Sequence, residues 1–309
     1  MDLEFRPIRS EDEPGGSAER SWLRAANPAG THTLAAFQGD RRLASATLVQ
    51  RRVWAVGKER CFGELVGLEG SRELVLVLRG LLDAHGGPAG ATVVYGRPDA
   101  THGKLLGRML GFETVRSETL LLRELDGGAD GSDAPRAAPA DVERLARFDD
   151  DARWLFERCS GEFGAAAIRD ASYLNWRFCE RPERDYVVLG VRDAERVLRG
   201  YAVLARGTSL LAGGTGEEWA LADWLVPPAE AGVGELLLRG ALAEVRAARG
   251  RRLVLLLPEW SPWFDVFQTW GFLVAPARSF LLAKSSTRRF DDLWLRESWW
   301  TTLSDWFAV

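Results

Sequence analysis

Residues 93–115, VVYGRPDATHGKLLGRMLGFETV, contain an apolar strand, a turn, a helix and a closing Gly111 followed by phenylalanine. Residues 253–275, LVLLLPEWSPWFDVFQTWGFLVA, follow the same plan and place Gly271 before a phenylalanine. Glycine suits the end of a helix because the left-handed conformation that terminates the helix costs it no Cβ clash. The two stretches therefore predict that one strand–helix–strand unit occurs twice in the chain.

A second pair of sequences supports this duplication. Trp22 precedes Pro28 by the same spacing that separates Trp176 from Pro182, and an alternating or continuous apolar run follows each pair. In each half a hairpin, a further strand, a helix, a strand, a helix and a closing strand are then expected. The first half is predicted to contain elements at 34–37, 43–53, 60–68, 73–85, 91–95, 101–110 and 112–124. The second half is predicted to contain elements at 186–191, 197–205, 218–226, 234–249, 253–257, 262–270 and 272–284.

This order of elements predicts the fold class and the domains. Hairpins followed by a strand–helix–strand–helix–strand run are typical of a mixed α/β (α+β) domain, whose mostly antiparallel sheet is flanked by helices. A chain of 309 residues is long enough for two such domains. Residues 126–141 contain no large apolar side chain and are predicted to be a linker. We therefore expect domains at 1–125 and 142–285, and a Trp-rich tail, 286–309, that docks on them.

Composition limits the classes of partner. The chain has 40 Lys and Arg against 44 Asp and Glu, a net charge of -4, so no overall field draws it to nucleic acid. Cys61, Cys159 and Cys179 lack the spacing of metal ligands, and scattered thiols are typical of a reducing compartment. We expect neither a metal site nor a nucleic-acid partner, and a cytoplasmic location.

The sequence also argues against membrane insertion. The amino terminus alternates apolar and charged residues and lacks the apolar core of a secretory signal. No uninterrupted apolar window is long enough to span a bilayer. The tail is rich in tryptophan, but it lacks the basic face that binds anionic lipid.

The succession of a strand such as VVYG or LLLP, a helix and Gly-Phe resembles the GNAT acyltransferase superfamily, repeated in tandem over nearly the whole chain. The segments WRFCERPERDYVVLGV, LADWLVPP and WWTTLSDWFAV are similar to a group of bacterial tandem GNAT-like proteins associated with polysaccharide and cell-envelope functions. The resemblance implies an N-acetyltransferase that moves an acyl group from acetyl-CoA, or another acyl-CoA, to a small amine such as an amino-sugar or envelope precursor.

The resemblance also implies where the cofactor binds. In GNAT enzymes its pyrophosphate lies on backbone N–H groups of the loop between the fourth strand and the next helix, because a helix N-terminus attracts anions. The first half offers 68–73 at this place, where Glu69 and Glu73 flank a single glycine. Two carboxylates would repel a diphosphate, so the N-terminal domain is expected to have a degenerate cofactor loop.

The second half has the better match. After Val226, the segment Gly232-Val233-Gly234 opens an apolar helix, although Ala229 stands where the family motif has Arg or Gln. The resemblance therefore implies that Val226, Gly232, Val233 and Gly234 bind the cofactor in the C-terminal domain. An ordinary strand-to-helix loop is the alternative.

Two carboxylates are candidates for the general base that deprotonates the amine. Asp223 and Glu64 each lie in an apolar strand, where an unpaired charge would be costly and so needs a reason. The alternative is that each pairs with a neighbouring arginine or caps a backbone group. The family's acid is commonly a Tyr on the last main helix, and neither matching helix contains one; His102 is the residue there that can donate a proton at neutral pH.

Aromatic residues surround the better candidate base. Trp219, Trp224 and Trp263 could form a flat-walled pocket for a sugar or an acyl chain. Ordinary packing between the two domains is the alternative, since aromatic side chains carry most of the buried area in cores and interfaces.

Two rival functions remain at this point. One is a non-catalytic GNAT-like binding or scaffold protein that has kept the fold and lost the cofactor loop. The other is a Fem-type aminoacyl transferase, which would use charged tRNA. The composition shows no basic channel and the expected elements include no long helical arm, so the Fem-type alternative is the weaker one.

Overall fold

The computed structural model describes residues 3–8, 17–125, 139, 141–207 and 218–306. The chain forms two compact units. Unit 1 comprises Met1–Ser117, Arg181–Glu183 and Ser279–Trp299, and unit 2 comprises Glu118–Glu180, Arg184–Arg278 and Trp300–Val309. Most of the predicted linker, 126–138 and 140, lies outside the described residues.

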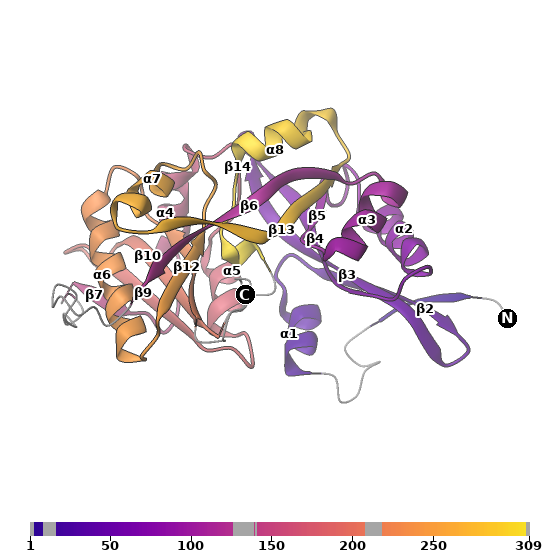
Figure 1. Cartoon of the computed structure of the whole chain (residues 1–309), viewed down its shortest axis with the longest axis horizontal. Coiled ribbons are helices and arrows are strands. Elements are labelled where there is room, and N and C mark those ends of the chain that lie inside the picture. Colours follow the sequence, from indigo (N-terminus) through magenta and orange to yellow (C-terminus); the bar gives the residue numbers. More distant parts are fainter. Residues whose placement is uncertain (1–2, 9–16, 126–138, 140, 208–217, 307–309) are drawn as a thin grey trace. The chain divides into compact units, whose positions relative to one another are not determined.

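Unit 1 is built on a mixed sheet (Figure 1). Among the described strands of this unit, β4 and β5 run parallel to each other, and the pairs β1–β2, β2–β3, β3–β4 and β5–β13 are antiparallel. The strands, in their order across the sheet, are β1 (Glu4–Pro7), β2 (Thr31–Gln38), β3 (Arg41–Ala55), β4 (Lys58–Glu69), β5 (Val93–Gly96) and the end of β13 (Leu273–Ser285). The helices are α1 (Ala18–Ala26), α2 (Leu74–His85), α3 (Ala100–Leu110), the short η3 (Arg288–Phe290) and α8 (Asp292–Ser298).

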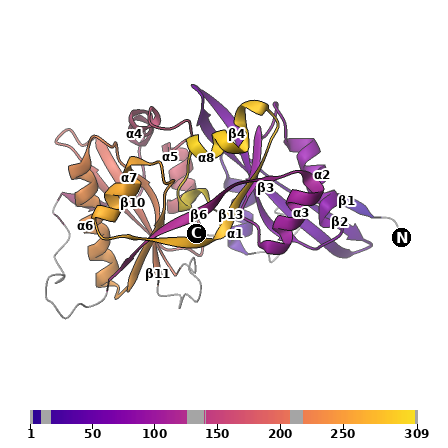
Figure 2. The ribbon, with the colours of Figure 1, turned by 45° about the horizontal axis from the view of Figure 1, so that its top comes forward.

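Helices α2 and α3 cover one face of this sheet (Figure 2). Their apolar faces are buried against the strands through Leu74, Leu78 and Leu106, as the helical spacing of these leucines predicts. Gly111 ends α3 with φ 70°, the left-handed conformation expected for that position.

Unit 2 repeats the plan. Strands β11 and β12 are its parallel pair, and the other neighbouring pairs are antiparallel. The strands, in their order across the sheet, are β6 (Glu113–Glu124), β12 (Arg252–Leu256), β11 (Glu218–Leu225), β10 (Leu198–Arg206), β9 (Tyr186–Arg192) and β7 (Val142–Arg144). The helices are α4 (Asp151–Ser160), α5 (Ala171–Leu174) continued by η2 (Asn175–Cys179), α6 (Ala231–Ala247), α7 (Pro262–Thr269) and η4 (Leu303–Asp305); two short strands, β8 (Ala165–Ala167) and β14 (Trp299–Trp300), complete the elements. The mixed, mostly antiparallel α/β class is thereby confirmed.

The two halves exchange their closing strands. The end of β6, from the first half, pairs with β12 in unit 2, with Leu120 opposite Leu256. The end of β13, from the second half, pairs with β5 in unit 1, with Leu282 opposite Gly96, and Leu282 joins the core of that unit. Figure 1 shows both strands among elements of the other half.

This exchange shifts the domain boundaries from the expected 1–125 and 142–285. Residues 118–125 belong to unit 2 and residues 279–285 belong to unit 1. The tail is also divided, because residues 286–299 lie in unit 1 and the described residues 300–306 lie in unit 2. A strand pattern predicts an extended segment, but it does not specify which sheet edge the segment joins.

Candidate cofactor groove

Asp223, the preferred candidate base, is fully buried in β11 of unit 2. Its Oδ2 accepts a hydrogen bond from the Tyr201 hydroxyl at 2.8 Å, and its Oδ1 accepts one from Thr302 Oγ1 at 2.7 Å. Arg169 donates to both oxygens at 3.4 Å. A carboxylate offers about four lone-pair directions, so these donors leave Asp223 no free site for a substrate amine.

Arg169 is the centre of this cluster, which we call the Arg169 network. It is fully buried and donates to Asp305 Oδ2 and Ser304 Oγ, each at 2.7 Å. Burial alone would lower the pKa of the guanidinium, but the carboxylates of Asp223 and Asp305 hold this pKa above its ordinary value. Thr302 and Asp305 form the capping box of η4, so the Arg169 network fastens the end of the tail to β11.

Glu64, the candidate base of the first half, is also buried and paired. It lies in β4 and accepts a hydrogen bond from the equally buried Arg51 on β3. Glu64 is opposite Tyr95 in the sheet, and the Trp299 ring packs edge-on against Tyr95 with a centroid distance of 4.7 Å. The tail therefore covers the sheet next to Glu64.

The predicted cofactor loop of unit 2 lies within a helix. Helix α6 begins at Ala231, earlier than expected, so Gly232 to Gly234 belong to its first turn. A Cβ on Gly232 would meet nothing within 4 Å, whereas a Cβ on Gly234 would lie 2.4 Å from the Trp263 ring. The Trp263 indole N–H donates to the Val226 carbonyl at 2.9 Å. Trp263 therefore fills the space between the end of β11 and the first turn of α6.

The three tryptophans predicted to line one pocket do not come together. Trp224 and Trp263 pack edge-to-face at 5.3 Å between ring centroids, within a cluster of rings that includes Phe267 and Trp270. Trp219 instead packs against Gly250, where an added Cβ would lie 2.5 Å from its ring. These rings form a packed core within unit 2, whereas the alternative left open by the sequence was packing between the two domains.

Unit 1 has an open groove between the two helices that follow its parallel strands. The loop after β4 leads into a groove of about 660 Å³ between α2 and α3, which we call the α2/α3 groove. Leu76 and Met109, which are 43% and 54% exposed, contribute an apolar surface. The lining consists of Ser71, Arg72, Val75, Leu76 and Arg79 from the loop and α2, and Lys104, Leu105, Arg108 and Met109 from α3.

All the charged side chains that line this groove are positive. Arg72, Arg79, Lys104 and Arg108 line it, and none of its lining residues is acidic. Within the part of the chain that the structure describes, these four side chains form no ion pair and no hydrogen bond. Unpaired cations around an apolar surface are suited to an anion that carries an apolar part.

The two carboxylates expected to repel an anion do not line the groove. Glu69 is held against β3, where Ser45 donates to it at 3.0 Å and Arg42 lies 3.3 Å away. Glu73 stands at the N-terminus of α2, outside the lining. Between them Gly70 turns the chain with φ 97°, and a Cβ there would lie 2.7 Å from the Leu43 carbonyl oxygen. The turn directs the chain from β4 into α2, so Glu69 stays beside β3 and outside the groove.

His102 lies in the first turn of α3. Asp99 caps this helix, accepts from the His102 backbone N–H at 2.9 Å, and contacts His102 Nδ1 at 2.7 Å through its other oxygen. These hydrogen bonds, the His102 backbone bond first, hold the pKa of Asp99 below its ordinary value. The imidazole is thereby oriented by a carboxylate, as a proton-transferring histidine requires.

Two further features concern metals and membranes. The three cysteines are free, and no group of His, Cys, Asp or Glu among the described residues could hold a metal ion. Among those same residues, every helix is too short or too polar to cross a membrane.

Solved structures share this fold. No protein-family model and no curated protein matches the sequence. A probable N-acyltransferase of unknown function from Enterococcus faecalis V583 aligns with 93% of this chain and 73% of its own, at 12% identity and a TM-score of 0.61. A tandem GNAT protein from the clavulanic acid biosynthesis pathway aligns over 93% and 99% of the two chains, at 15% identity and a TM-score of 0.54.

A third neighbour was solved with a ligand. It is Saccharomyces cerevisiae N-myristoyltransferase with bound myristoyl-CoA, covering 91% of this chain and 82% of its own, at 11% identity and a TM-score of 0.56. At such low sequence identities, the similarity to these structures shows the fold alone. The chain has the tandem GNAT fold that its sequence resembles, and the expected two-fold repetition of a GNAT-like architecture is confirmed.

Proposed function

We propose that the protein is an acyl-CoA-dependent N-acyltransferase whose cofactor binds in unit 1, at the α2/α3 groove. The single observation that carries this proposal is the set of four unpaired cations in that groove. The tandem GNAT fold supports it, and so does a structural neighbour that holds myristoyl-CoA. The proposal moves the cofactor from the C-terminal half, which the sequence favoured, because Trp263 fills the space beside the predicted cofactor loop of unit 2.

The residues of the groove fit the charged end of CoA. Arg72 precedes the N-terminus of α2, where backbone N–H groups favour an anion, Arg79 lies in the middle of that helix, and Lys104 and Arg108 lie across the groove. Leu76 and Met109 would pack against the apolar parts of the cofactor. When bound, acyl-CoA supplies an activated acyl group as a thioester.

The acceptor in this proposal is a small amine, such as an amino-sugar or envelope precursor. The protein would act on it in the cytoplasm. The acid that the sequence left open would be His102 as an imidazolium, because the Asp99 carboxylate accepts from Nδ1–H and leaves the Nε2 proton as the one that can be donated. Asp223 and Glu64 would not act as bases. Each instead keeps a buried arginine neutralised within its own unit.

A second function is favoured by one observation, the burial and pairing of both predicted bases. Without a free carboxylate at either site, the protein could bind acyl-CoA without transferring the acyl group. This alternative retains the α2/α3 groove as the binding site.

Two measurements separate these functions. The first is the shift in unfolding temperature caused by CoA, acetyl-CoA and longer acyl-CoAs, since a ligand at 100 times its Kd stabilises a protein by about 2.7 kcal/mol. The second is thiol release from the same acyl-CoAs in the presence of a panel of amines. Stabilisation with amine-dependent thiol release is expected, and stabilisation without it would support the binding protein. No stabilisation by any of these ligands would contradict both.

A further inference from the structure

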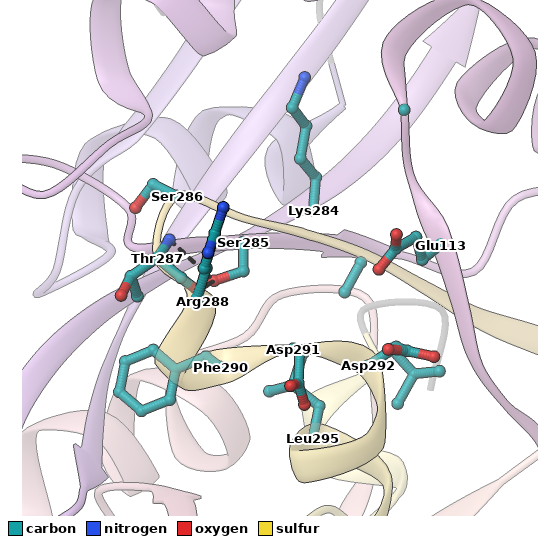
Figure 3. Close-up of a pocket in the computed structure, with 13 residues that line it drawn as sticks. Glu113, Lys284, Ser285, Ser286, Thr287, Arg288, Phe290, Asp291, Asp292 and Leu295 are labelled. Atoms are coloured by element: carbon teal, nitrogen blue, oxygen red, sulfur yellow. Dashed lines mark hydrogen bonds between the residues drawn. The ribbon is translucent and has the colours of Figure 1, made fainter.

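A second cavity in unit 1 is unconnected with the α2/α3 groove. It has a volume of about 390 Å³ and lies where β13 ends and the chain turns through η3 into α8, beside the start of β6 (Figure 3). Its apolar surface comes from four buried side chains, Val115, Ala283, Phe290 and Leu295. No residue lines both sites.

The rim of this cavity carries opposed charges. Figure 3 shows Glu113 and Asp292 on one side and Arg288 on the other. All three are exposed and, within the described chain, none forms an ion pair or a side-chain hydrogen bond. Glu113 comes from β6 and Asp292 from α8, so two separate elements bring the carboxylates to one side.

The remaining polar groups of the cavity already have partners. Lys284 extends away from the other labelled side chains in Figure 3, and its Nζ donates to the Leu110 carbonyl at 2.6 Å. Asp291 caps α8 by accepting from the Trp294 backbone N–H at 2.8 Å. The rim side chains that form no ion pair or side-chain hydrogen bond are therefore two carboxylates and one guanidinium; Lys284 and Asp291, bonded to neutral backbone groups, keep their charges of opposite sign.

The hydroxyls are occupied as well. Ser285 Oγ donates to the Thr287 carbonyl at 2.7 Å, and Ser286 Oγ donates to the Thr92 carbonyl at 2.9 Å. A neutral polyol would need free hydroxyl groups to hydrogen-bond to, whereas in this cavity the groups available to a ligand are the charged side chains of the rim. An anion alone would face two carboxylates and would be disfavoured.

We propose that this cavity binds a small aliphatic amine of about amino-acid size. Its ammonium lies between Glu113 and Asp292, its carbon chain lies on Val115, Phe290 and Leu295, and a carboxylate, where the ligand has one, pairs with Arg288. The volume is at the lower end of the roughly 300–1,000 Å³ of ligand pockets. This site is independent of the proposed acyl transfer.

Isothermal titration with three probes of similar length tests the proposal. The probes are 1,5-diaminopentane, lysine and hexanoate, and the titrations use the full chain without acyl-CoA, so that the result does not depend on transfer activity. The two amines are expected to bind saturably and hexanoate is not. The double variant Glu113→Gln/Asp292→Asn should weaken both amines by roughly tenfold or more, because hydrogen bonds to charged groups are the strong ones.

Two further variants sharpen the result. Arg288→Gln should weaken lysine and leave diaminopentane unchanged, because only lysine has a carboxylate. Glu297→Gln, on the same helix and outside the cavity, is the matched control and should change neither. The proposal is overturned if the wild-type protein binds neither amine saturably, if hexanoate binds as well as diaminopentane, or if the Glu113→Gln/Asp292→Asn variant binds like the wild type.

Discussion

The two units share one order of elements, yet they differ at the junction that follows β4 in unit 1 and β11 in unit 2. In unit 1, β4 leads through Gly70 to an open groove lined by four unpaired cations. In unit 2, β11 leads to a glycine-rich turn that looks more like a cofactor loop, but Trp263 occupies the space beside it. The comparison teaches that glycines permit a ligand or a side chain to approach the backbone closely. The surrounding side chains determine whether that space is open to a ligand or already filled.

The candidate bases teach a parallel lesson. Glu64 lies in β4 and Asp223 lies in β11, the first strand of the parallel pair in each unit, and each faces a buried arginine from another element of that unit. A buried charge is costly unless it is paired, so a carboxylate in an apolar strand signals a partner as readily as it signals catalysis. The units differ in that Arg169 has two carboxylate partners and also fastens the tail.

The largest expected effect is on the Arg169 network. Asp223→Asn removes one of the two charges that balance Arg169 and should lower the free energy of unfolding of unit 2 by about 3–5 kcal/mol, the cost of breaking a buried ion pair. Urea unfolding followed by tryptophan fluorescence measures it. Glu235→Gln, which removes an exposed ion pair with Arg239 on α6, is the control and should cost under about 1 kcal/mol. A stable Asp223→Asn protein with greatly reduced turnover would instead identify Asp223 as catalytic.

A smaller effect is expected at the first turn of α6. Gly234→Ala would drive a Cβ into the Trp263 ring and should destabilise unit 2 by about 1–3 kcal/mol, as overpacking does. Gly232→Ala, in open space two residues away, should be neutral or stabilise by up to about 1 kcal/mol. Equal effects of the two substitutions on thermal unfolding would show that Trp263 does not occupy this position in solution.

The smallest effect is on stability between pH 9 and 10. Burial raises the pKa of Cys159 to about 12 from the ordinary value of 9.0, so native unit 2 keeps this proton when the unfolded chain loses it. Stability should therefore be intact below pH 9 and fall as the pH rises from 9 towards 12, by up to about 1.4 kcal/mol per pH unit. Burial and then Asp223 also raise the pKa of Tyr201, which acts in the same direction above pH 10.

Comparing the unfolding curves of the wild type and the Cys159→Ala variant between pH 9 and 10 isolates the contribution of Cys159. Cys159→Ala should remove part of the alkaline slope in this window, while Tyr201 and the other thiols keep theirs. An unchanged slope in Cys159→Ala would mean that the thiol titrates alike in the native and unfolded chains.

Much of the fold could be predicted from the sequence because the repeated strand–helix–Gly-Phe stretches determine local structure. The left-handed Gly111 and the apolar faces of α2 and α3 follow directly from residue type and spacing. The exchange of β6 and β13 could not be predicted, because any apolar strand offers the same backbone donors and acceptors to either sheet edge.

The site was predictable only in part. The sequence identified Asp223 and Glu64 as carboxylates in apolar strands, but their partners come from distant positions, with Arg169 contributing from beyond β8. That arginine follows the apolar run Ala165–Ala167 and Ile168, a local signal of a buried charge. The groove cations are spaced along two helices, and only the packing of α2 beside α3 brings them together.

The most direct test of the central claim is calorimetric titration of CoA into variants that add negative charge to one unit at a time. Arg79→Glu/Arg108→Glu reverses two charges of the α2/α3 groove, and Gly232→Asp places a carboxylate in open space at the N-terminus of α6, which tolerates acidic residues. Arg41→Glu, at the exposed start of β3, is the control. We predict that the double variant loses roughly tenfold or more in CoA affinity, while Gly232→Asp and Arg41→Glu bind like the wild type. Loss of binding in Gly232→Asp, with normal binding by the double variant, would contradict the account and return the cofactor to unit 2.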